Sequence, residues 1–462
     1  MPDTHKISFV ITNAPPLVGG LEKACLRIAQ NFQRRGHKVQ ILARFTSGRH
    51  GLSGYFKDSE PARTFEFEGV EIKVVGLDWF SRLLLSPVFK LIWRKWTFPL
   101  ARWLYVSAMC GRLLKECHGA NVVHYFGNGP EMLGFAAAAA ARRAGAKFFV
   151  DPALHEGQWG DTWIDSLIYR QADLMFCYSL HEKRVIEKLG IPSAKIRKVS
   201  CGFDYIDSGE GAHFRATYGI AGPTVLFLGR KTRAKGVGRL LEAWPMVAEK
   251  FPEATLVIAG PKSTELRQMA DGGWRMVDGR VAPEDRRSKM EDRGAAEPPV
   301  ENPAGIKIQD ATGQDGGGLL ADSAGGAKAL DAGRSTLDTA PKACVLNLDD
   351  LSEEEKQDAL AACDLLCVPS EGESFGMVYF EAWAYEKPVV ALDLPVLRES
   401  VGATDGGLLV KSTPWEIAQG ISKLLENPAL RTAMGLNGKK LAARHKWSVA
   451  IDSYLENYEG IL

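Results

Sequence analysis

Residues 365–399 read LLCVPSEGESFGMVYFEAWAYEKPVVALDLPVLRE. The apolar run Leu365–Val368 has the length and composition of a buried strand, and Pro369 ends it. A polar loop follows, then a helical pattern from Gly376 to about Lys387, and a second apolar run after Pro388. Two parallel strands need a crossover connection, which is usually a helix. The order strand, loop, helix, strand therefore predicts one parallel β/α unit.

The loop of this unit places backbone N–H groups at a helix start, where the helix dipole favours an anion. Glu373 lies in the loop, and Glu381 lies eight positions later on the helix. The simpler interpretation is one solvated loop glutamate and one glutamate on a helix surface. The alternative is a nucleotide-sugar site, in which Glu381 accepts hydrogen bonds from the two ribose hydroxyls. Glu373 would then hold sugar hydroxyls, and the N–H groups of Phe375 and Gly376 would face the phosphates.

The same stretch resembles the retaining glycosyltransferases of the GT-B fold, in particular glycosyltransferase family four. Glu373 and Glu381 have the spacing of the family's Glu-x7-Glu signature, and residues 374–376 and 388–390 fit its local pattern. One departure is Glu386, where the family usually has glycine. The resemblance implies an α/β protein with two doubly wound, Rossmann-like domains that face a cleft.

The length of 462 residues predicts two or three domains. We expect the following division: an acceptor-binding domain over 1–205, a nucleotide-sugar-binding domain over 206–445, and a C-terminal helix over 446–462 that crosses back to the first domain. Residues 275–340 contain no Phe, Trp or Tyr and are dominated by Gly, Ala and Asp. Such a segment cannot bury enough apolar area to offset its ordering entropy. We therefore predict a mostly disordered insertion at about 271–340.

The overall composition excludes several classes of protein. Lys plus Arg number 57 and Asp plus Glu number 56, so no global field favours nucleic acid. The eight cysteines form no CxxC pair, which indicates buried free thiols in a reducing compartment. The first ten residues lack the apolar core of a secretory signal, and no apolar run reaches the roughly 18 residues of a membrane span. These features predict a cytoplasmic protein.

Two candidate ligand positions lie in the first half of the chain. Gly19 and Gly20 form a turn between an expected strand and a helix. Such a turn is common, but a glycine pair also lets a phosphate or an acceptor approach the backbone. His155 follows the expected strand Lys147–Val150, at the edge where α/β folds bind ligands. A lone loop histidine is more often structural, whereas the resemblance places His155 near the transferred sugar.

The loop that follows the expected strand Val225–Leu228 is rich in cations and reads GRKTRAKG over residues 229–236. It is either a solvated basic turn or a site for the diphosphate of a sugar nucleotide. Arg230 and Lys235 match the family's GRxxxxKG pattern in residue type and spacing. The sequence contains no recognisable metal-ligand cluster, so side chains and helix dipoles would neutralise the diphosphate. We therefore predict metal-independent chemistry.

Residues 77–105 combine eight aromatic side chains with five basic ones and a single acidic one, Asp78. Two interpretations stay open. The segment is either a core-facing pair of helices with a basic outer edge, or a membrane-surface patch in which Trp lies at the headgroups and Lys or Arg meets anionic lipid. The second interpretation predicts peripheral attachment to the inner face of a membrane and suits a lipid-linked acceptor.

Several enzyme classes lack their motifs in this chain. No GxGxxG follows a strand, and neither a P-loop nor a GxSxG elbow is present. The leading hypothesis is a retaining hexosyltransferase that uses a UDP- or GDP-sugar, needs no other cofactor, and glycosylates a saccharide or a lipid-linked saccharide. Its predicted catalytic residues are Glu373, His155, Arg230 and Lys235. Its predicted nucleotide-sugar-binding residues are Gly19, Gly20, Arg230, Lys235, Glu373, Ser374, Phe375, Gly376 and Glu381.

Two alternatives remain beside this hypothesis. One is a sugar-nucleotide epimerase or phosphorylase of the same fold. The other is a catalytically degenerate scaffold that binds nucleotide sugars. Glu386 and the long insertion are the two features that suggest it. The sequence does not specify the donor base, the sugar, the acceptor or the oligomeric state.

Overall fold

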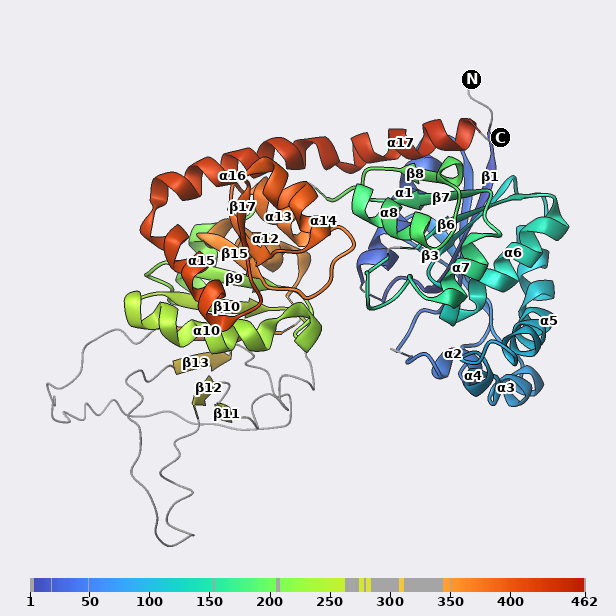
Figure 1. The fold of residues 1–462 in the computed structure, drawn as a ribbon, viewed down its shortest axis with the longest axis horizontal. Coiled ribbons are helices and arrows are strands. Elements are labelled where there is room, and N and C mark those ends of the chain that lie inside the picture. The colour runs from blue at the N-terminus through green and yellow to red at the C-terminus, as the bar shows by residue number, and fades with distance from the viewer. Residues whose placement is uncertain are drawn as a thin grey trace, which may run out of the picture.

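The structure is a computed structural model that describes residues 4–460 apart from 18, 49, 153, 205–207, 262–273, 278–279, 284–306, 311–343 and 350. Two largely parallel sheets, each with helices around it, form two domains that lie side by side (Figure 1). The predicted fold class, two doubly wound α/β domains, is confirmed. Most of the insertion predicted at about 271–340 lies outside the described residues, so its disorder stays a prediction.

The first sheet has eight strands in the order β3-β4-β2-β1-β5-β6-β7-β8. The strands are β1 (Lys6–Asn13), β2 (Lys38–Phe45), β3 (Arg63–Phe67), β4 (Val70–Val74), β5 (Val122–Phe126), β6 (Lys147–Asp151), β7 (Leu174–Cys177) and β8 (Ile196–Lys198). All neighbours pair in parallel except β3 and β4. The β3–β4 hairpin was not predicted, because β3 is an edge strand whose side chains are all exposed or half-buried.

In the described residues, eight helices lie among the strands of the first sheet along the chain. They are α1 (Gly20–Arg34), α2 (Gly54–Lys57), α3 (Trp79–Leu85), α4 (Val88–Leu91), α5 (Phe98–Cys117), α6 (Leu133–Ala144), α7 (Trp163–Tyr169) and α8 (Leu180–Lys188). Short 3₁₀ turns lie at Gly129–Glu131 and Ser193–Lys195. Helices α5 and α6 pack along each other, and α2, α3 and α4 gather at the lower end of this domain (Figure 1).

The second sheet has seven described strands in the order β13-β14-β10-β9-β15-β16-β17, all parallel. The strands are β9 (Thr224–Leu228), β10 (Thr255–Ala259), β13 (Lys307–Asp310), β14 (Cys344–Leu348), β15 (Leu365–Val368), β16 (Val389–Leu392) and β17 (Gly407–Val410). Two more strands, β11 (Trp274–Val277) and β12 (Arg280–Pro283), pair antiparallel with each other. The strands of the unit at 365–399, β15 and β16, are neighbours in the sheet, as the sequence predicts.

The helices of the second domain are α9 (Gly211–Thr217), α10 (Val237–Lys250), α12 (Glu353–Ala362), α13 (Met377–Ala384), α14 (Pro395–Leu397), α15 (Pro414–Glu426) and α16 (Pro428–Ala442). A 3₁₀ turn precedes α10 at Arg233–Lys235, a π turn follows α14 at Arg398–Gly402, and a 3₁₀ turn follows α16 at Ala443–His445. The fully buried Trp244 and Trp383 lie on α10 and α13.

The chain passes between the domains twice, and the two passages touch. The Phe203 N–H donates to the His445 carbonyl at 3.1 Å. A Cβ added at Gly202 would lie 2.2 Å from the Trp447 ring, so glycine permits this close packing. Helix α17 (Trp447–Glu459) then runs to the first domain (Figure 1). There the Tyr454 hydroxyl donates to Asp151 at 2.8 Å. Among the described residues, no helix combines the length and apolar character needed to cross a membrane.

Candidate functional site

Each sheet has a point where the strand order reverses direction, and ligands of doubly wound folds bind beyond the carboxyl ends of the strands at such a point. In the second sheet this point lies between β9 and β15. The loops that follow these strands are residues 229–236 and 369–376, which contain most of the predicted site residues. In the first sheet the point lies between β1 and β5. Gly19 and Gly20 follow β1, so both sets of predicted residues lie at ligand-binding edges.

The two loops of the second domain are held together by a charged pair and by backbone contacts. The Lys235 ammonium donates to Glu373 Oε1 at 2.6 Å, and the Glu373 side chain is only 7% exposed. The Glu371 N–H donates to the Ala234 carbonyl at 2.9 Å. Gly236 has φ 77°, and a Cβ added there would lie 1.9 Å from the Pro369 oxygen. Only glycine fits this position, and it fixes Lys235 beside Glu373.

The four cations of the basic loop have different surroundings. Arg230 is exposed, and no carboxylate of the described residues forms an ion pair with its guanidinium. Lys231 is 1% exposed, donates to the Leu348 carbonyl at 2.8 Å and pairs with Asp349. Lys231 therefore ties the loop to the end of β14, whereas Arg230 faces solvent. The described part of the chain contains no group of three or more His, Cys, Asp or Glu side chains arranged to hold a metal.

The helix at the centre of the predicted site begins at a left-handed glycine. Gly376 has φ 80° and caps α13, one residue before the helix starts. Phe375 is buried, with its ring centroid 4.6 Å from that of Phe380 and 5.3 Å from that of His445. Burial lowers the pKa of His445 to about 4, so this imidazole is neutral behind the loop. The apolar support fixes the backbone around Ser374, which lies at the surface of the interdomain pocket.

Glu381 has a partner that the sequence analysis missed. The Lys356 ammonium, on α12, donates to Glu381 Oε1 at 3.1 Å and lies 2.5 Å from Glu353 Oε1. Burial by itself would lower the pKa of Lys356, but the charges of Glu381 and Glu353 outweigh it and raise that pKa above its ordinary value. No local signal reveals this pair, because its members lie 25 positions apart on different helices.

The glycine pair of the first domain faces helix α13 of the second. A Cβ added at Gly20 would lie 3.1 Å from Met377 Cε. Met377 and Glu381 are four positions apart on one helix, so they lie on the same face. At Gly19 an added Cβ would meet the Glu22 carboxylate instead. The turn at Gly19-Gly20 therefore lies against the start of the helix that carries Glu381.

The loop after β6 reaches the second domain near Glu373. A Cβ added at Gly372 would lie 2.4 Å from the Gln158 amide nitrogen. His155 lies in the same loop, and its ring centroid is 4.1 Å from that of Trp159. The backbone N–H of His155 donates to the Trp159 carbonyl. An interdomain pocket in this region is lined by Leu154, Glu156, Ser179, His181, Glu182, Glu371, Gly372, Glu373, Ser374, Leu394, Pro395 and Val396. His155 therefore lies in the chain between two residues of the pocket wall, Leu154 and Glu156.

A second interdomain contact was also missed from the sequence. The Leu180 N–H, at the start of α8, donates to Glu399 Oε2 at 2.7 Å. Negative charge near a helix N-terminus is favourable because of the helix dipole. Glu399 lies in the π turn after α14, next to the pocket wall at Leu394–Val396. This contact holds the two domains together on one side of the pocket.

The first domain has a buried carboxyl group at its own reversal point. Glu131 Oε2 accepts hydrogen bonds from the Thr12 hydroxyl, at the end of β1, and from the Tyr125 hydroxyl at 3.1 Å. Burial raises the pKa of Glu131 to about 7. Glu131 was not predicted from the sequence, although it follows a Gly-Asn-Gly-Pro turn at the end of a strand. The two loops at this point are therefore joined through one carboxyl group.

Two protein families match parts of this chain. Residues 19–202 match the glycosyl transferase 4-like domain, and residues 341–441 match the glycosyl transferases group 1. The first match covers the domain with Gly19 and Gly20, and the second covers the stretch from which the sequence analysis started.

Curated relatives and solved structures agree with these matches. The D-inositol 3-phosphate glycosyltransferase of Kineococcus radiotolerans is 39% identical over 23% of this chain and 27% of its own length. The phosphatidyl-myo-inositol mannosyltransferase of Mycobacterium tuberculosis is 28% identical over 60% of this chain and 56% of its own length. The chain thus matches between about a quarter and just over half of these relatives. The structure of Anabaena HepE with UDP-glucose has a TM-score of 0.65 at 14% identity, over 99% of this chain and 100% of that one.

Proposed function

Since the chain belongs to the GT-B glycosyltransferases, with a glycosyl transferase 4-like first half and a group 1 C-terminal region, we propose that it transfers a hexose-type sugar from a UDP- or GDP-sugar. The acceptor is a hydroxyl of a saccharide or of a lipid-linked saccharide. The reaction retains the anomeric configuration and needs no metal ion. The observation that carries the proposal is the pair Lys235–Glu373 beside the exposed Arg230, at the strand ends where β9 and β15 meet.

The donor diphosphate lies against Arg230 and Lys235 in this proposal. Arg offers a planar fork of donors and Lys a mobile point charge, and both suit phosphate oxygens. Lys235 can exchange Glu373 for a phosphate, which leaves the Glu373 carboxylate to accept hydrogen bonds from the sugar hydroxyls. The N–H groups of Phe375 and Gly376 add the positive end of the α13 dipole. The UDP-glucose held by the structurally similar HepE supports a UDP-linked donor.

Glu381 accepts hydrogen bonds from the ribose hydroxyls, as acidic residues do in other nucleotide-binding α/β folds. Lys356 donates to this carboxylate at 3.1 Å and fixes its position on the helix. Gly20 contributes a surface without a side chain opposite Met377. The donor therefore lies along the face of α13 that the first domain covers.

The acceptor hydroxyl enters from the first domain and attacks the sugar on the face that the nucleotide leaves. His155 and Glu373 hold the sugar, and the departing phosphate takes the hydroxyl proton. Charge builds on the leaving phosphate in this step, and Arg230 and Lys235 stabilise it. The name of the mycobacterial mannosyltransferase, which refers to phosphatidyl-myo-inositol, supports a lipid-linked acceptor.

A binding screen followed by a transfer assay tests the proposal. A ligand at a hundred times its dissociation constant adds about 2.7 kcal/mol to the stability of the folded state, so thermal shifts with UDP- and GDP-hexoses identify the donor. Arg230→Ala should then lower the rate of transfer about 100- to 1,000-fold, the effect of removing one donor to a developing negative charge. Lys250→Ala is the control, because Lys250 ends α10 at the opposite edge of the sheet.

The outcomes separate the alternatives. Unchanged transfer in Arg230→Ala contradicts the assignment. Donor epimerisation without an acceptor, or sugar release that requires inorganic phosphate, indicates the epimerase or phosphorylase instead. If a nucleotide sugar shifts the unfolding temperature but no transfer or donor breakdown is detected with any acceptor, the catalytically degenerate scaffold is the better description.

A further inference from the structure

We propose that helices α3, α4 and the first turns of α5 form a docking face for an anionic lipid bilayer. We call this the aromatic-basic face. Its large exposed apolar members are Trp79, Phe80, Leu83, Leu84, Trp93, Trp96, Leu100 and Trp103. Its exposed cations are Arg82, Lys90, Arg94, Lys95 and Arg102. Vesicle binding by this face does not require the proposed transferase activity.

The apolar members of this face are not part of the core. Trp79, Trp96 and Trp103 are 72%, 76% and 64% exposed. The same helices bury a different set of side chains against the first domain, which comprises Leu85, Val88, Ile92, Phe98 and Tyr105. The inner side of each helix is therefore already packed, and the outer side presents large rings to solvent. Monomeric soluble proteins rarely expose contiguous apolar patches of this kind, and such patches mark interaction sites.

The charge of the face selects its partner. Five cations lie among the aromatic rings, and the one acid, Asp78, caps α3 through the Ser81 N–H and pairs with Arg112. The whole chain has a formal charge of only +1, so the positive charge is concentrated locally. A second copy of this chain would bring five more cations against these five. An anionic bilayer instead neutralises them and accepts the Trp rings at headgroup level.

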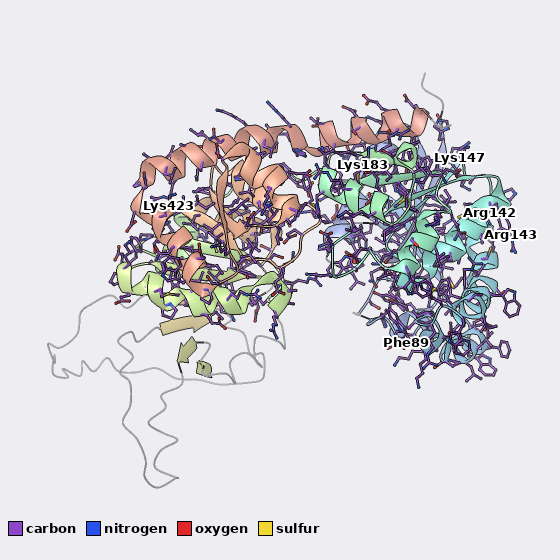
Figure 2. The ribbon with its side chains drawn as sticks, in the orientation of Figure 1. Phe89, Arg142, Arg143, Lys147, Lys183 and Lys423 are labelled. Carbon is purple, nitrogen blue, oxygen red and sulfur yellow. The ribbon has the colours of Figure 1, made fainter. Side chains whose placement is uncertain are left out.

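The position of the face leaves the rest of the molecule free. Helices α3 and α4 lie at the lower end of the first domain, and the second domain lies to its left (Figure 1). Phe89, on α4, marks this end among the side chains drawn in Figure 2. Docking here orients the first domain toward the bilayer and keeps the donor loops of the second domain in water.

A short path of contacts joins the face to the interdomain edge of the first sheet. The Arg82 guanidinium donates to the Lys57 carbonyl at 2.8 Å, at the end of α2. Phe56, on α2, packs against Tyr105 with ring centroids 5.5 Å apart. The neighbouring Tyr55 hydroxyl accepts a hydrogen bond from the Asn13 amide at 3.2 Å, at the end of β1. An acceptor anchored in the bilayer would therefore meet the first domain beside its ligand edge.

Vesicle co-sedimentation of the full chain tests the inference. The probes are vesicles of phosphatidylcholine alone and of phosphatidylcholine with an equal share of phosphatidylglycerol, with no nucleotide sugar present. We expect binding to the anionic vesicles that weakens with added salt, because salt shortens the screening length. The double variant Arg94→Gln/Lys95→Gln should lower the partition coefficient roughly thirtyfold, at about a factor of five for each cation near the surface.

Substitution of the rings separates insertion from charge attraction. Trp79→Ser, Trp96→Ser and Trp103→Ser combined should lower partitioning by about tenfold or more, since the apolar area no longer leaves water. The matched controls lie in the second domain: Trp415→Ser removes a ring that is 58% exposed, and Lys411→Gln removes a cation that is 80% exposed. Neither control should change binding.

Three results overturn the inference: no binding to anionic vesicles, equal loss in the controls and in the face variants, or a wild-type dimer that the ring substitutions convert to a monomer. The last result would assign the face to a second copy. Because Arg230→Ala should bind vesicles like the wild type, failure of vesicle binding leaves the donor site untouched, and failure of donor binding leaves the face untouched.

Discussion

The reversal points of the two sheets have the same topology but different electrostatics. Between β9 and β15 the acidic side chains form ion pairs with lysines, as in Lys235–Glu373 and Lys356–Glu381. Between β1 and β5 the carboxyl group of Glu131 is buried among hydroxyl groups, and its burial raises its pKa to about 7. One domain therefore holds exchangeable charges at its ligand edge, and the other holds a group that is largely protonated below neutral pH.

This difference teaches how two similar folds can divide a reaction. A paired lysine can give up its carboxylate for a phosphate at little net electrostatic cost, because one anion replaces another. A buried carboxyl group with hydroxyl partners has no cation that could exchange it for a phosphate. Its main effect is on the stability of the domain and on how that stability changes with pH. Substitutions in the second domain should therefore change donor chemistry, and those in the first should change the pH dependence of stability.

Lys235→Ala should give the largest effect. It removes a donor to the leaving phosphate, so transfer should fall about 100- to 1,000-fold. It also leaves the buried Glu373 carboxylate without its cation, at a cost of roughly 1–3 kcal/mol in unfolding free energy. The double variant Lys235→Ala/Glu373→Gln should regain that stability and stay inactive. If the double variant regains transfer, the pair is structural and the comparison between the two edges fails.

Glu381→Gln should weaken donor binding about 10- to 100-fold, because hydrogen bonds to a charged group contribute about 1.5–3 kcal/mol. Titration calorimetry with the donor identified in the screen measures the change. Glu353→Gln is the matched control, since it removes the other carboxylate beside Lys356 and leaves the ribose partner in place. If both variants lose the same donor affinity, the loss comes from the disturbed position of Lys356 and not from a missing hydrogen bond to the ribose.

Glu131→Gln should remove a pH dependence of stability from the first domain. The folded-state pKa of Glu131 is raised from its ordinary value of 4.5 to about 7. Its contribution to stability is therefore fully present below about pH 4.5 and is lost as the pH rises toward 7, by at most about 1.4 kcal/mol per pH unit. Urea unfolding at pH 5, 6 and 7 should show a shallower decline in the variant. The exposed Glu249→Gln should keep the wild-type slope; an unchanged slope in Glu131→Gln contradicts the buried carboxyl group.

Glu386→Gly should give the smallest effect. Glu386 has φ 58°, a left-handed conformation that costs a residue with a side chain roughly 1–2 kcal/mol. Lys439 holds it at 2.8 Å, and the flexibility of glycine offsets part of the gain, so the variant should be about 0.5–1 kcal/mol more stable. Donor affinity should not change, since Glu386 lies beyond the end of α13. A change in affinity would link this residue to the site after all.

The case of Glu386 also shows how far local sequence reasoning reached. Glutamate at this position adopts φ 58°, a left-handed conformation that glycine adopts at little cost. The strands β15 and β16 on either side of α13 still pair in parallel, as the sequence predicts. The resemblance drawn from Glu373 and Glu381 is confirmed by the two family matches, whereas the roles of individual site residues stay predictions.

The doubly wound architecture and the loops at the carboxyl ends of its strands could be predicted from local patterns in the sequence. Alternating apolar runs and helical patterns are local properties, and parallel strands bring the loops at their carboxyl ends to one edge. Arg230, Lys235 and Glu373 were grouped because they also match the motifs of the family that the sequence resembles.

Which cations of those loops are exposed, and which aromatic side chains face solvent, depends on the packing of whole elements. Lys231 is buried against Asp349, 118 positions away, while Arg230 next to it faces solvent. Lys356 meets Glu381, and Trp79, Trp96 and Trp103 point away from a core that other residues of the same helices already fill. Burial and the pairing of distant charges depend on how whole elements pack, and no short window of sequence contains that information.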